Sequence, residues 1–193
     1  LNKGKPPRVM VVTSSIHSEG KTVTTLNLAF SLAEAVHKPK VLLIDADLRK
    51  GKVAHYLGVD QKVGLSEVLS AKAKMEEAVF HLDHENLSFM IAGEVPENPA
   101  ELLASDKMKD FLNEMRSKYD FILIDTPPII AVTDSGIVGS QADGVLLVIQ
   151  AGRTQRGIVK RAEELLYQSH TKVLGHVLTN IEYHLPEYIY RYL

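Results

Sequence analysis

The sequence predicts an α/β fold with a doubly wound, mostly parallel β-sheet that is flanked by helices on both faces. Uniformly apolar runs of strand length alternate along the chain with segments whose apolar residues recur at helical spacing. Strands that are apolar at every position are typical of a parallel sheet covered on both faces. The alternation of strand and helix favours right-handed crossovers between parallel neighbours.

Each run predicts one element. The expected strands, in chain order, are Val9–Thr13, Lys40–Asp45, Phe121–Asp125, Gly144–Ile149 and Lys172–Thr179. The expected helices are one that begins at Thr22, then Lys107–Lys118 and Arg156–Ser169. A chain of 193 residues is short enough to fold around one hydrophobic core. We therefore expect one domain over residues 1–181 and a short tail over residues 182–193.

The composition excludes several classes of protein. The formal net charge of −2 argues against binding to nucleic acid or to a membrane surface through overall positive charge. The absence of cysteine excludes disulfides, thiolate metal sites and a cysteine nucleophile, and the eight histidines show no metal-ligand spacing. No apolar run approaches the roughly 20 residues that span a bilayer. We therefore expect a cytoplasmic protein, and a start at Leu1 rather than Met suggests a piece of a longer chain.

Residues 15–22, SIHSEGKT, have the context of a phosphate-binding loop, with a strand before them and a helix after them. Ser15 replaces the first glycine of the pattern G-x-x-x-x-G-K-[ST], but backbone N–H groups and the helix N-terminus still favour an anion. Gly20 allows close approach to phosphates, Lys21 supplies positive charge, and the Thr22 hydroxyl suits a Mg²⁺ shell. The expected nucleotide-binding residues here are Ser15, His17, Ser18, Glu19, Gly20, Lys21, Thr22 and Val23. The alternative is a helix N-terminus with an accidental Gly-Lys-Thr.

Acidic residues end two of the predicted strands. Asp45 and Asp47 follow one strand as DAD and face the same side in an extended chain, and Asp125 ends another strand. Because ligands of an open α/β sheet bind beyond the carboxyl ends of its strands, we expect all three carboxylates at the phosphate loop. We interpret Lys21, Asp45, Asp47 and Asp125 as catalytic residues and Thr22, Asp47 and Asp125 as metal ligands. Helix capping is the alternative for the acids, above all for Asp47. Asp45 is favoured as the proton acceptor of the pair, although the sequence leaves that division open.

Four segments occur in a fixed order, followed by a tyrosine-bearing tail: VTSSIHSEGKT, VLLIDADLRKGKVAHYLG, IAGEVPENPAELL and FILIDTPP. Together they resemble the bacterial tyrosine autokinases that regulate capsule and exopolysaccharide synthesis. The resemblance implies a P-loop NTPase of the MinD/ParA-like group with ATP and Mg²⁺ as cofactors. It assigns residues 15–22 to the first ATP-binding motif, Asp45 and Asp47 to the second, and Asp125 to the third. It also places Asn180 against the adenine ring, although a turn asparagine explains that position nearly as well.

The tail contains the expected phosphoacceptors, Tyr183, Tyr188, Tyr190 and Tyr192. Their alternation is compatible with a half-buried edge strand. Chain ends are usually poorly ordered, however, and a free tail can enter a neighbour's nucleotide site. We therefore predict phosphorylation in trans, which requires self-association. Relatives usually assemble a ring through an upstream Glu-x-x-Arg-x-x-Arg helix, and this sequence begins too late to contain it.

The resemblance implies further partners. They are a membrane polysaccharide co-polymerase or chain-length protein as activator, fused upstream or separate, and a protein-tyrosine phosphatase as antagonist. They place the domain at the inner face of the cell membrane, through that partner or a missing N-terminal segment. Nucleic acid is not expected.

Two other functions remain open. A MinD/ParA-like switch ATPase has the same fold, but such proteins carry a second lysine early in the loop, where this chain has Ile16. A regulatory nucleotide-binding module with little turnover is opposed by the intact loop lysine and acidic residues. For Arg49, Lys50 and Lys52, a solvated basic loop and a role in guiding phosphates are equally supported.

Overall fold

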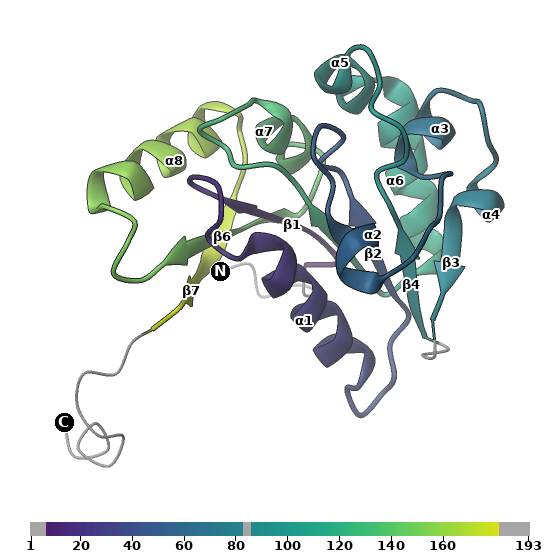
Figure 1. The fold of residues 1–193 in the computed structure, drawn as a ribbon, viewed down its shortest axis with the longest axis horizontal. Helices are drawn as coiled ribbons and strands as arrows, with labels where there is room; N and C mark the ends of the chain where they lie inside the picture. The colour runs from purple at the N-terminus through teal and green to yellow at the C-terminus, as the bar shows by residue number, and fades with distance from the viewer. Residues whose placement is uncertain (1–6, 83–85, 182–193) are drawn as a thin grey trace.

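A seven-stranded sheet forms the centre of the computed structural model, which describes residues 7–82 and 86–181 (Figure 1). The strand order is β3-β4-β2-β5-β1-β6-β7. The strands are β1 (Val9–Ser14), β2 (Val41–Asp45), β3 (Val79–His81), β4 (Leu87–Met90), β5 (Phe121–Asp125), β6 (Gly144–Gln150) and β7 (Val173–Thr179). β3 pairs with β4 in antiparallel orientation, and the other neighbouring pairs are parallel. The predicted doubly wound, mostly parallel sheet is confirmed.

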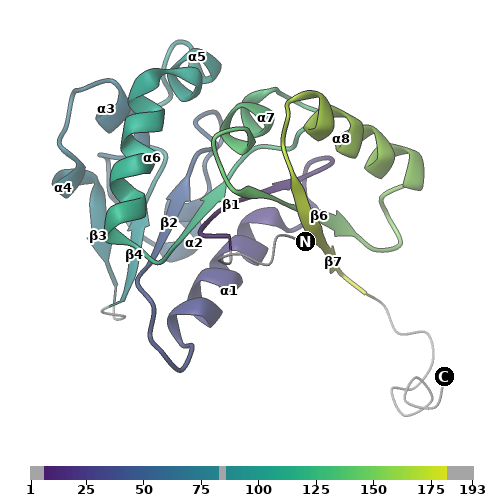
Figure 2. The same cartoon turned by 180° about the vertical axis from the view of Figure 1, so that it is seen from behind.

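Helices cover both faces of this sheet. One face carries α1 (Lys21–Ala33) and α2 (Val53–Leu57), which lie in front in Figure 1. The other face is seen in Figure 2, and its helices are α3 (Leu65–Leu69), α4 (Met75–Ala78), α5 (Pro99–Ala104), α6 (Asp106–Lys118), α7 (Asp134–Gly139) and α8 (Arg156–Gln168). Among the described helices, none is long and apolar enough to cross a bilayer.

The alternation of side chains along each strand divides the interior into two apolar cores. In β2, Leu42 and Ile44 belong to the core beneath α6 and its neighbours, whereas Val41 and Leu43 belong to the core beneath α1. All four side chains are completely buried. Burial on both faces explains why this strand is a continuous apolar run in the sequence, since neither face needs polar residues.

The predicted strands and helices lie within about two residues of the observed ones, a usual uncertainty for element ends. The sequence did not predict β3, β4 or the short helices α2 to α5 and α7. β4 has four residues and α2 has five, which is too short for an apolar period to show. The tail tyrosines lie outside the described residues, as do residues 1–6.

Phe89 on β4 provides a test of the core beneath α1. Its buried ring lies 6.0 Å from the ring of Phe30 on α1 and 5.8 Å from the ring of Phe80 on β3, measured between centroids. Phe89→Ala leaves a cavity between these rings and should lower the free energy of unfolding by about 3–5 kcal/mol in urea denaturation. Val36→Ala, at a side chain that is 93% exposed, should change it by less than about 0.5 kcal/mol. Equal effects of the two substitutions would contradict the assignment of Phe89 to the core.

Candidate active site

The site is built where β1, β5 and β2 end next to one another. β5 lies between the other two strands, and Asp125 at its end is in register with Val12 of β1 and with Asp45 of β2. β1 leads into the loop at residues 15–20, and α1 begins directly afterwards at Lys21. Because these strands are parallel, the loop and the acidic residues meet at one edge of the sheet, as expected from the sequence.

The loop enters α1 through two residues with left-handed backbone. Gly20 has a φ of 91° and Ser18 a φ of 63°. A side chain at Gly20 would be strained and would also come within 3.4 Å of Thr179 Cγ2. The first N–H groups of a helix have no partner within the helix, so α1 presents them at this loop. Together with the helix dipole they favour an anion there.

Lys21 lies between two carboxylates. Its Nζ is 3.3 Å from Asp125 Oδ2 and 3.5 Å from Asp47 Oδ2. Thr22 Oγ1 donates a 2.7 Å hydrogen bond to the same oxygen of Asp125, and Thr25 Oγ1 lies 3.2 Å from the other oxygen. Asp125 is completely buried, so Lys21 and Thr22 are what stabilise its ionised form. Thr25, which lies one helical turn after Lys21, is a site residue that the sequence did not predict.

Asp45 and Asp47 do not share one environment, although an extended chain would turn both to the same side. β2 ends at Asp45, which is 1% exposed and accepts 3.0 Å hydrogen bonds from the N–H groups of Asp47 and Val53. Val53 is the first residue of α2, so the capping alternative describes Asp45 better than Asp47. Asp47 accepts from the N–H of Lys50 with Oδ1 and turns Oδ2 toward Lys21.

Burial changes the protonation of this acidic group. Loss of solvent raises the pKa of Asp45 to about 7, and the nearby Asp125 carboxylate adds to the shift, while the Val53 N–H and the Lys21 charge oppose it. Burial also raises the pKa of Asp125, against the opposing effect of Lys21 and the Thr22 hydroxyl. Carboxyl groups with raised pKa values beside a cation are typical of functional sites.

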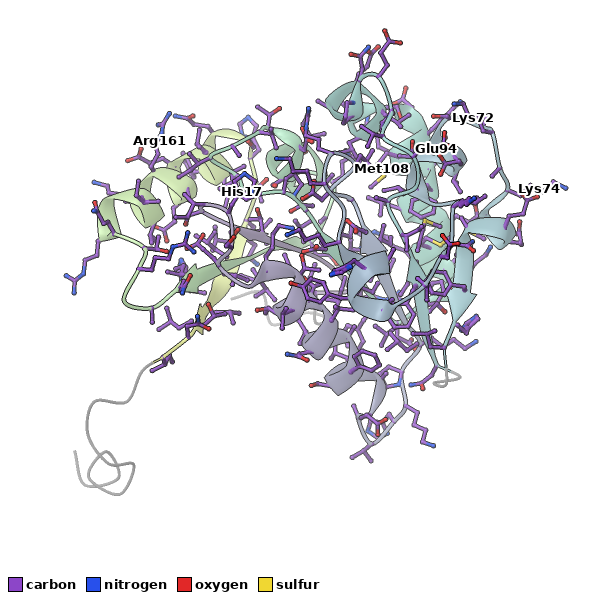
Figure 3. The ribbon with its side chains drawn as sticks, in the orientation of Figure 1. His17, Lys72, Lys74, Glu94, Met108 and Arg161 are labelled. Carbon is purple, nitrogen blue, oxygen red and sulfur yellow. The ribbon has the colours of Figure 1, made fainter. Side chains whose placement is uncertain are left out.

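A cavity of about 400 Å³ opens beside the loop. Its walls are His17, Ser18, Gly20, Lys21, Thr22, Val23, Asp47, Lys50, Lys52 and Tyr56. His17 projects from the connection between β1 and α1 (Figure 3). Tyr56 on α2 is a cavity residue that the sequence did not predict, and only its position one helical turn after Lys52 could have indicated it.

Three predicted nucleotide-binding residues do not line this cavity. The Ser15 side chain is completely buried, and its hydroxyl has no hydrogen-bond partner among the described residues. Glu19 is also buried, with its carboxylate turned to the protein interior. Asn180 is exposed directly after β7, with a φ of 50° that suits a turn asparagine.

Glu19 holds the loop against the far side of the sheet edge. One carboxylate oxygen accepts from the Ile16 N–H at 2.7 Å, and the other accepts from the Gln150 N–H at 3.3 Å and from the Thr154 hydroxyl. The Thr179 hydroxyl at the end of β7 donates to the Glu19 carbonyl oxygen at 2.7 Å. The loop is therefore fixed to the ends of both β6 and β7.

The basic residues after the acidic pair have different partners. Arg49 makes a two-point contact with the completely buried Asp134, through Nε at 2.8 Å and Nη2 at 3.2 Å. This contact ties the loop after β2 to α7. Lys50 and Lys52 are exposed on the cavity wall instead.

The oxygen atoms beside Lys21 fit a magnesium ion with a nucleotide phosphate. Thr22 Oγ1 and a carboxylate oxygen of Asp125 lie 2.7 Å apart, and Asp47 faces the same lysine. Mg²⁺ prefers oxygen ligands and is usually held by one or two carboxylates plus substrate phosphates.

Known proteins match this chain in sequence. The family described as an AAA domain matches residues 8–172. Tyrosine-protein kinase YwqD of Bacillus subtilis (strain 168) is 42% identical over 169 residues, which cover 88% of this chain and 70% of that protein. Tyrosine-protein kinase CpsD of Streptococcus agalactiae is 36% identical over 186 residues, which cover 96% of this chain and 80% of that protein.

Solved structures match the fold. The chimerical protein CapA2B2 has a TM-score of 0.89 at 28% identity, over 94% of this chain and 79% of that chain. The kinase domain of VpsO has a TM-score of 0.85 at 37% identity, over 91% of this chain and 86% of that chain. The cell division ATPase MinD of Pyrococcus furiosus has a TM-score of 0.72 at 28% identity, over 90% of this chain and 72% of that chain.

The fold and the phosphate loop define a P-loop NTPase of the MinD/ParA-like group. Within that group, the chain belongs to the bacterial tyrosine-protein kinases, and its enzymatic class is that of a protein-tyrosine kinase. The family resemblance noted in the sequence is thereby confirmed.

The raised pKa of Asp45 predicts how the stability of the nucleotide-free protein depends on pH. This carboxyl group stays protonated up to about pH 7 in the folded protein, but in the unfolded chain it ionises near its ordinary value of 3.8. The folded state therefore binds more protons between these values, and the free energy of unfolding should fall as pH rises toward 7. The contribution of one such group is at most about 1.4 kcal/mol per pH unit, and it levels off above pH 7.

Urea denaturation of Asp45→Asn at a series of pH values from 5 to 8 tests this effect. The variant lacks the titrating group, so its free energy of unfolding should depend less steeply on pH than that of the unmodified protein. Asp60→Asn, at an exposed position, is the matched control and should keep the original slope. Identical slopes for all three proteins would show that Asp45 titrates alike in the folded and unfolded states.

Proposed function

We propose that this kinase is an ATP- and Mg²⁺-dependent autokinase that phosphorylates tyrosines in the tail of a neighbouring copy. The observation that carries the proposal is the position of Lys21 at the N-terminus of α1, within 3.5 Å of both Asp47 and Asp125. A cation at a phosphate loop, flanked by carboxylates and a threonine hydroxyl, has the parts needed to bind a metal–nucleotide complex. The names of YwqD and CpsD point to tyrosine as the acceptor in relatives.

In this proposal, catalysis is mainly positioning and charge neutralisation. The phenolic oxygen of the acceptor bonds to the γ-phosphorus while the bond to the β–γ bridging oxygen breaks and ADP leaves. Lys21 and the N–H groups of the loop bind the phosphate oxygens on which charge accumulates. Thr22, Asp47 and Asp125 are the residues that would hold Mg²⁺, which supplies further neutralisation. The transition state is loose, so the acceptor needs little activation.

We assign the proton of the phenol to Asp47. The sequence favours Asp45, but both Asp45 oxygens accept backbone hydrogen bonds and its side chain is almost completely enclosed. Asp47 lines the cavity with the oxygen that faces Lys21. In this assignment, Asp45 fixes the turn that presents Asp47, and Asp47 orients the phenol and accepts its proton late in the transfer.

The arrangement of the sheet supports transfer between copies. In the proposed division, a kinase domain over residues 1–181 is followed by a tail over residues 182–193, which includes Tyr183, Tyr188, Tyr190 and Tyr192. The domain ends after β7, whereas Asp47 follows β2, and β6, β1 and β5 lie between these two strands. A tail that starts at β7 therefore has to cross the ends of three strands of its own sheet to reach its own Asp47. We also propose Asn180, at that end of the sheet, as the contact for the adenine ring.

We extend the proposal to regulation of capsular or exopolysaccharide polymerisation and export. An activating membrane co-polymerase would bring the domain to the inner face of the cell membrane, and a protein-tyrosine phosphatase would reverse the modification. Each phosphate adds roughly −1.5 to −2 charges, so several on one tail repel one another and the acidic site. Multiple phosphorylation should therefore loosen self-association.

Intact-mass and peptide mass spectrometry after incubation with Mg·ATP tests the proposal. We expect phosphotyrosine within residues 182–193, and a loss of at least about 100-fold in its rate of formation in Lys21→Met, because the cation at the transferred phosphate is removed. Lys160→Met makes the same change at an exposed position on α8 and should keep the activity.

Phosphate release measured in parallel separates the competing functions. ATP hydrolysis without any modified tyrosine, even after addition of an upstream Glu-x-x-Arg-x-x-Arg helix and an activator segment, would contradict the autokinase and support a switch ATPase. Neither hydrolysis nor transfer under those conditions would support a regulatory nucleotide-binding module.

A further inference from the structure

The cavity beside Lys21 has a basic and aromatic wall that the proposed transfer mechanism does not use. This wall consists of Lys50, Lys52 and Tyr56, and we call it the β2 rim because all three residues follow that strand. Lys50 and Lys52 are exposed, and in residues 7–82 and 86–181 neither ammonium group has an ion-pair partner. Tyr56 is 51% exposed. Two unpaired cations and an accessible aromatic ring thus face the same cavity as the catalytic lysine.

The backbone of the β2 rim is held firmly beside the acidic pair. The N–H of Lys50 donates to Asp47 Oδ1 at 3.0 Å. Between the two lysines, Gly51 packs so closely on Asp45 that a Cβ atom there would lie 2.7 Å from Asp45 Oδ2 and 2.7 Å from Ala92 Cβ. Glycine is therefore required at this turn, and the turn places one lysine on each side of it.

Arg49 shows that the three neighbouring cations have separate tasks. Its guanidinium is occupied by the two-point contact with the buried Asp134 and stabilises the loop. Among the described residues, Lys50 and Lys52 make no comparable contact, so their charge is available to a ligand. The contact with Asp134 gives Arg49 a structural partner, which neither alternative from the sequence described.

The position of the β2 rim along the sheet edge indicates which ligand it meets. The phosphate loop follows β1, and the proposed adenine contact follows β7 on one side of it. The β2 rim lies on the opposite side, beyond Asp125 at the end of β5. A nucleotide that runs from β7 to the phosphate loop has its terminal phosphate toward the β2 rim. The acceptor must reach that phosphate, so the β2 rim borders the acceptor's path.

We infer that the β2 rim is an acceptor subsite, which binds an anionic side chain next to the tyrosine that receives the phosphate. Lys50 and Lys52 hold the anion, and the Tyr56 ring packs against the acceptor chain. The inference rests on the proposed function, because it names the acceptor chemistry of the same site. It makes the site selective for tyrosines with a negatively charged neighbour, since unpaired ammonium groups form charge-assisted hydrogen bonds with carboxylate or phosphate oxygens.

The tail contains two sources of such an anion. Glu187 precedes Tyr188, and Tyr188 and Tyr190 are two residues apart. In an extended chain, side chains two residues apart project to the same side at a spacing of roughly 6.6 Å. A phosphate on one tyrosine would therefore lie beside the next acceptor. In this way the first transfer creates the anion that the β2 rim binds during the second, whereas further phosphates exceed its two cations and are repelled by the acidic site.

Tail peptides given in trans to the intact chain test the inference. Each peptide covers residues 182–193 and keeps one acceptor, with phenylalanine at the other tyrosine positions. In one pair of peptides Tyr188 is the acceptor, and Glu187→Gln removes the carboxylate beside it. In the other pair Tyr190 is the acceptor, and phosphotyrosine at position 188 supplies a phosphate. We expect the phosphorylated peptide to have a KM about tenfold lower than the parent, and the Glu187→Gln peptide to have a higher KM.

The same peptides are then compared in rim variants. In Lys50→Ala/Lys52→Ala, the advantage of the anionic peptides should fall below about twofold, with the effect on the KM for peptide rather than the KM for ATP. Lys72→Ala/Lys74→Ala is the matched control, because these exposed lysines are also separated by one residue and project between α3 and α4, away from the cavity (Figure 3). Tyr56→Phe should keep the KM for peptide, and Tyr56→Ala should raise it.

Peptide binding measured by fluorescence anisotropy, with a non-hydrolysable ATP analogue present, decides the inference even without transfer. Tighter binding of the anionic peptides that disappears in Lys50→Ala/Lys52→Ala supports it. An unchanged preference in that variant overturns the inference, because the lysines then bind neither the peptide nor the nucleotide. A rise confined to the KM for ATP also overturns it, because the lysines then contact the nucleotide. Absence of phosphotyrosine on every peptide would count against the proposed autokinase, whereas the binding measurement would still answer the question of the subsite.

Discussion

The structure depends on the burial of Asp125 at the centre of the sheet edge. A completely buried carboxylate is unstable unless neighbouring groups compensate its charge. Here the compensation comes from Lys21 and Thr22, the first two residues of α1, while the Thr25 hydroxyl one turn later donates a 2.8 Å hydrogen bond to the Lys21 carbonyl oxygen. The helix must therefore begin directly above the end of β5. That requirement places the phosphate loop, the cation and the oxygens proposed to bind a metal together.

The loop itself is held from the opposite side of the edge. Glu19 is hydrogen-bonded to the N–H of Gln150 and the hydroxyl of Thr154, and its carbonyl oxygen is bonded to Thr179. Its side chain therefore shapes the loop without lining the cavity. On the β2 side, Asp45 performs the comparable task for Asp47 through two backbone N–H groups. Buried carboxylates thus position the residues that face a ligand, which explains why the site contains more acids than direct contacts require.

Much of this arrangement was predictable from the sequence, because local patterns carry it. Uniformly apolar strands such as Phe121–Asp125 show a sheet buried on both faces, and a Gly-Lys-Thr between strand and helix shows a phosphate loop. The short strands β3 and β4 left no period to detect. The distinct surroundings of Asp45 and Asp47 depend on where β2 ends. The partner of Arg49 is Asp134, 85 positions further along the chain, so no local pattern reveals it.

The most direct test of the central claim is calorimetric titration of a non-hydrolysable ATP analogue into the protein with and without Mg²⁺, compared between the unmodified chain and Thr22→Val. Valine has nearly the size of threonine but lacks the hydroxyl that bonds to Asp125. We predict that Mg²⁺ tightens binding to the unmodified chain and to a Thr24→Val control, and that this gain is lost in Thr22→Val while binding without Mg²⁺ is retained. An equal gain from Mg²⁺ in all three proteins would contradict a metal–nucleotide site built on Thr22 and Asp125.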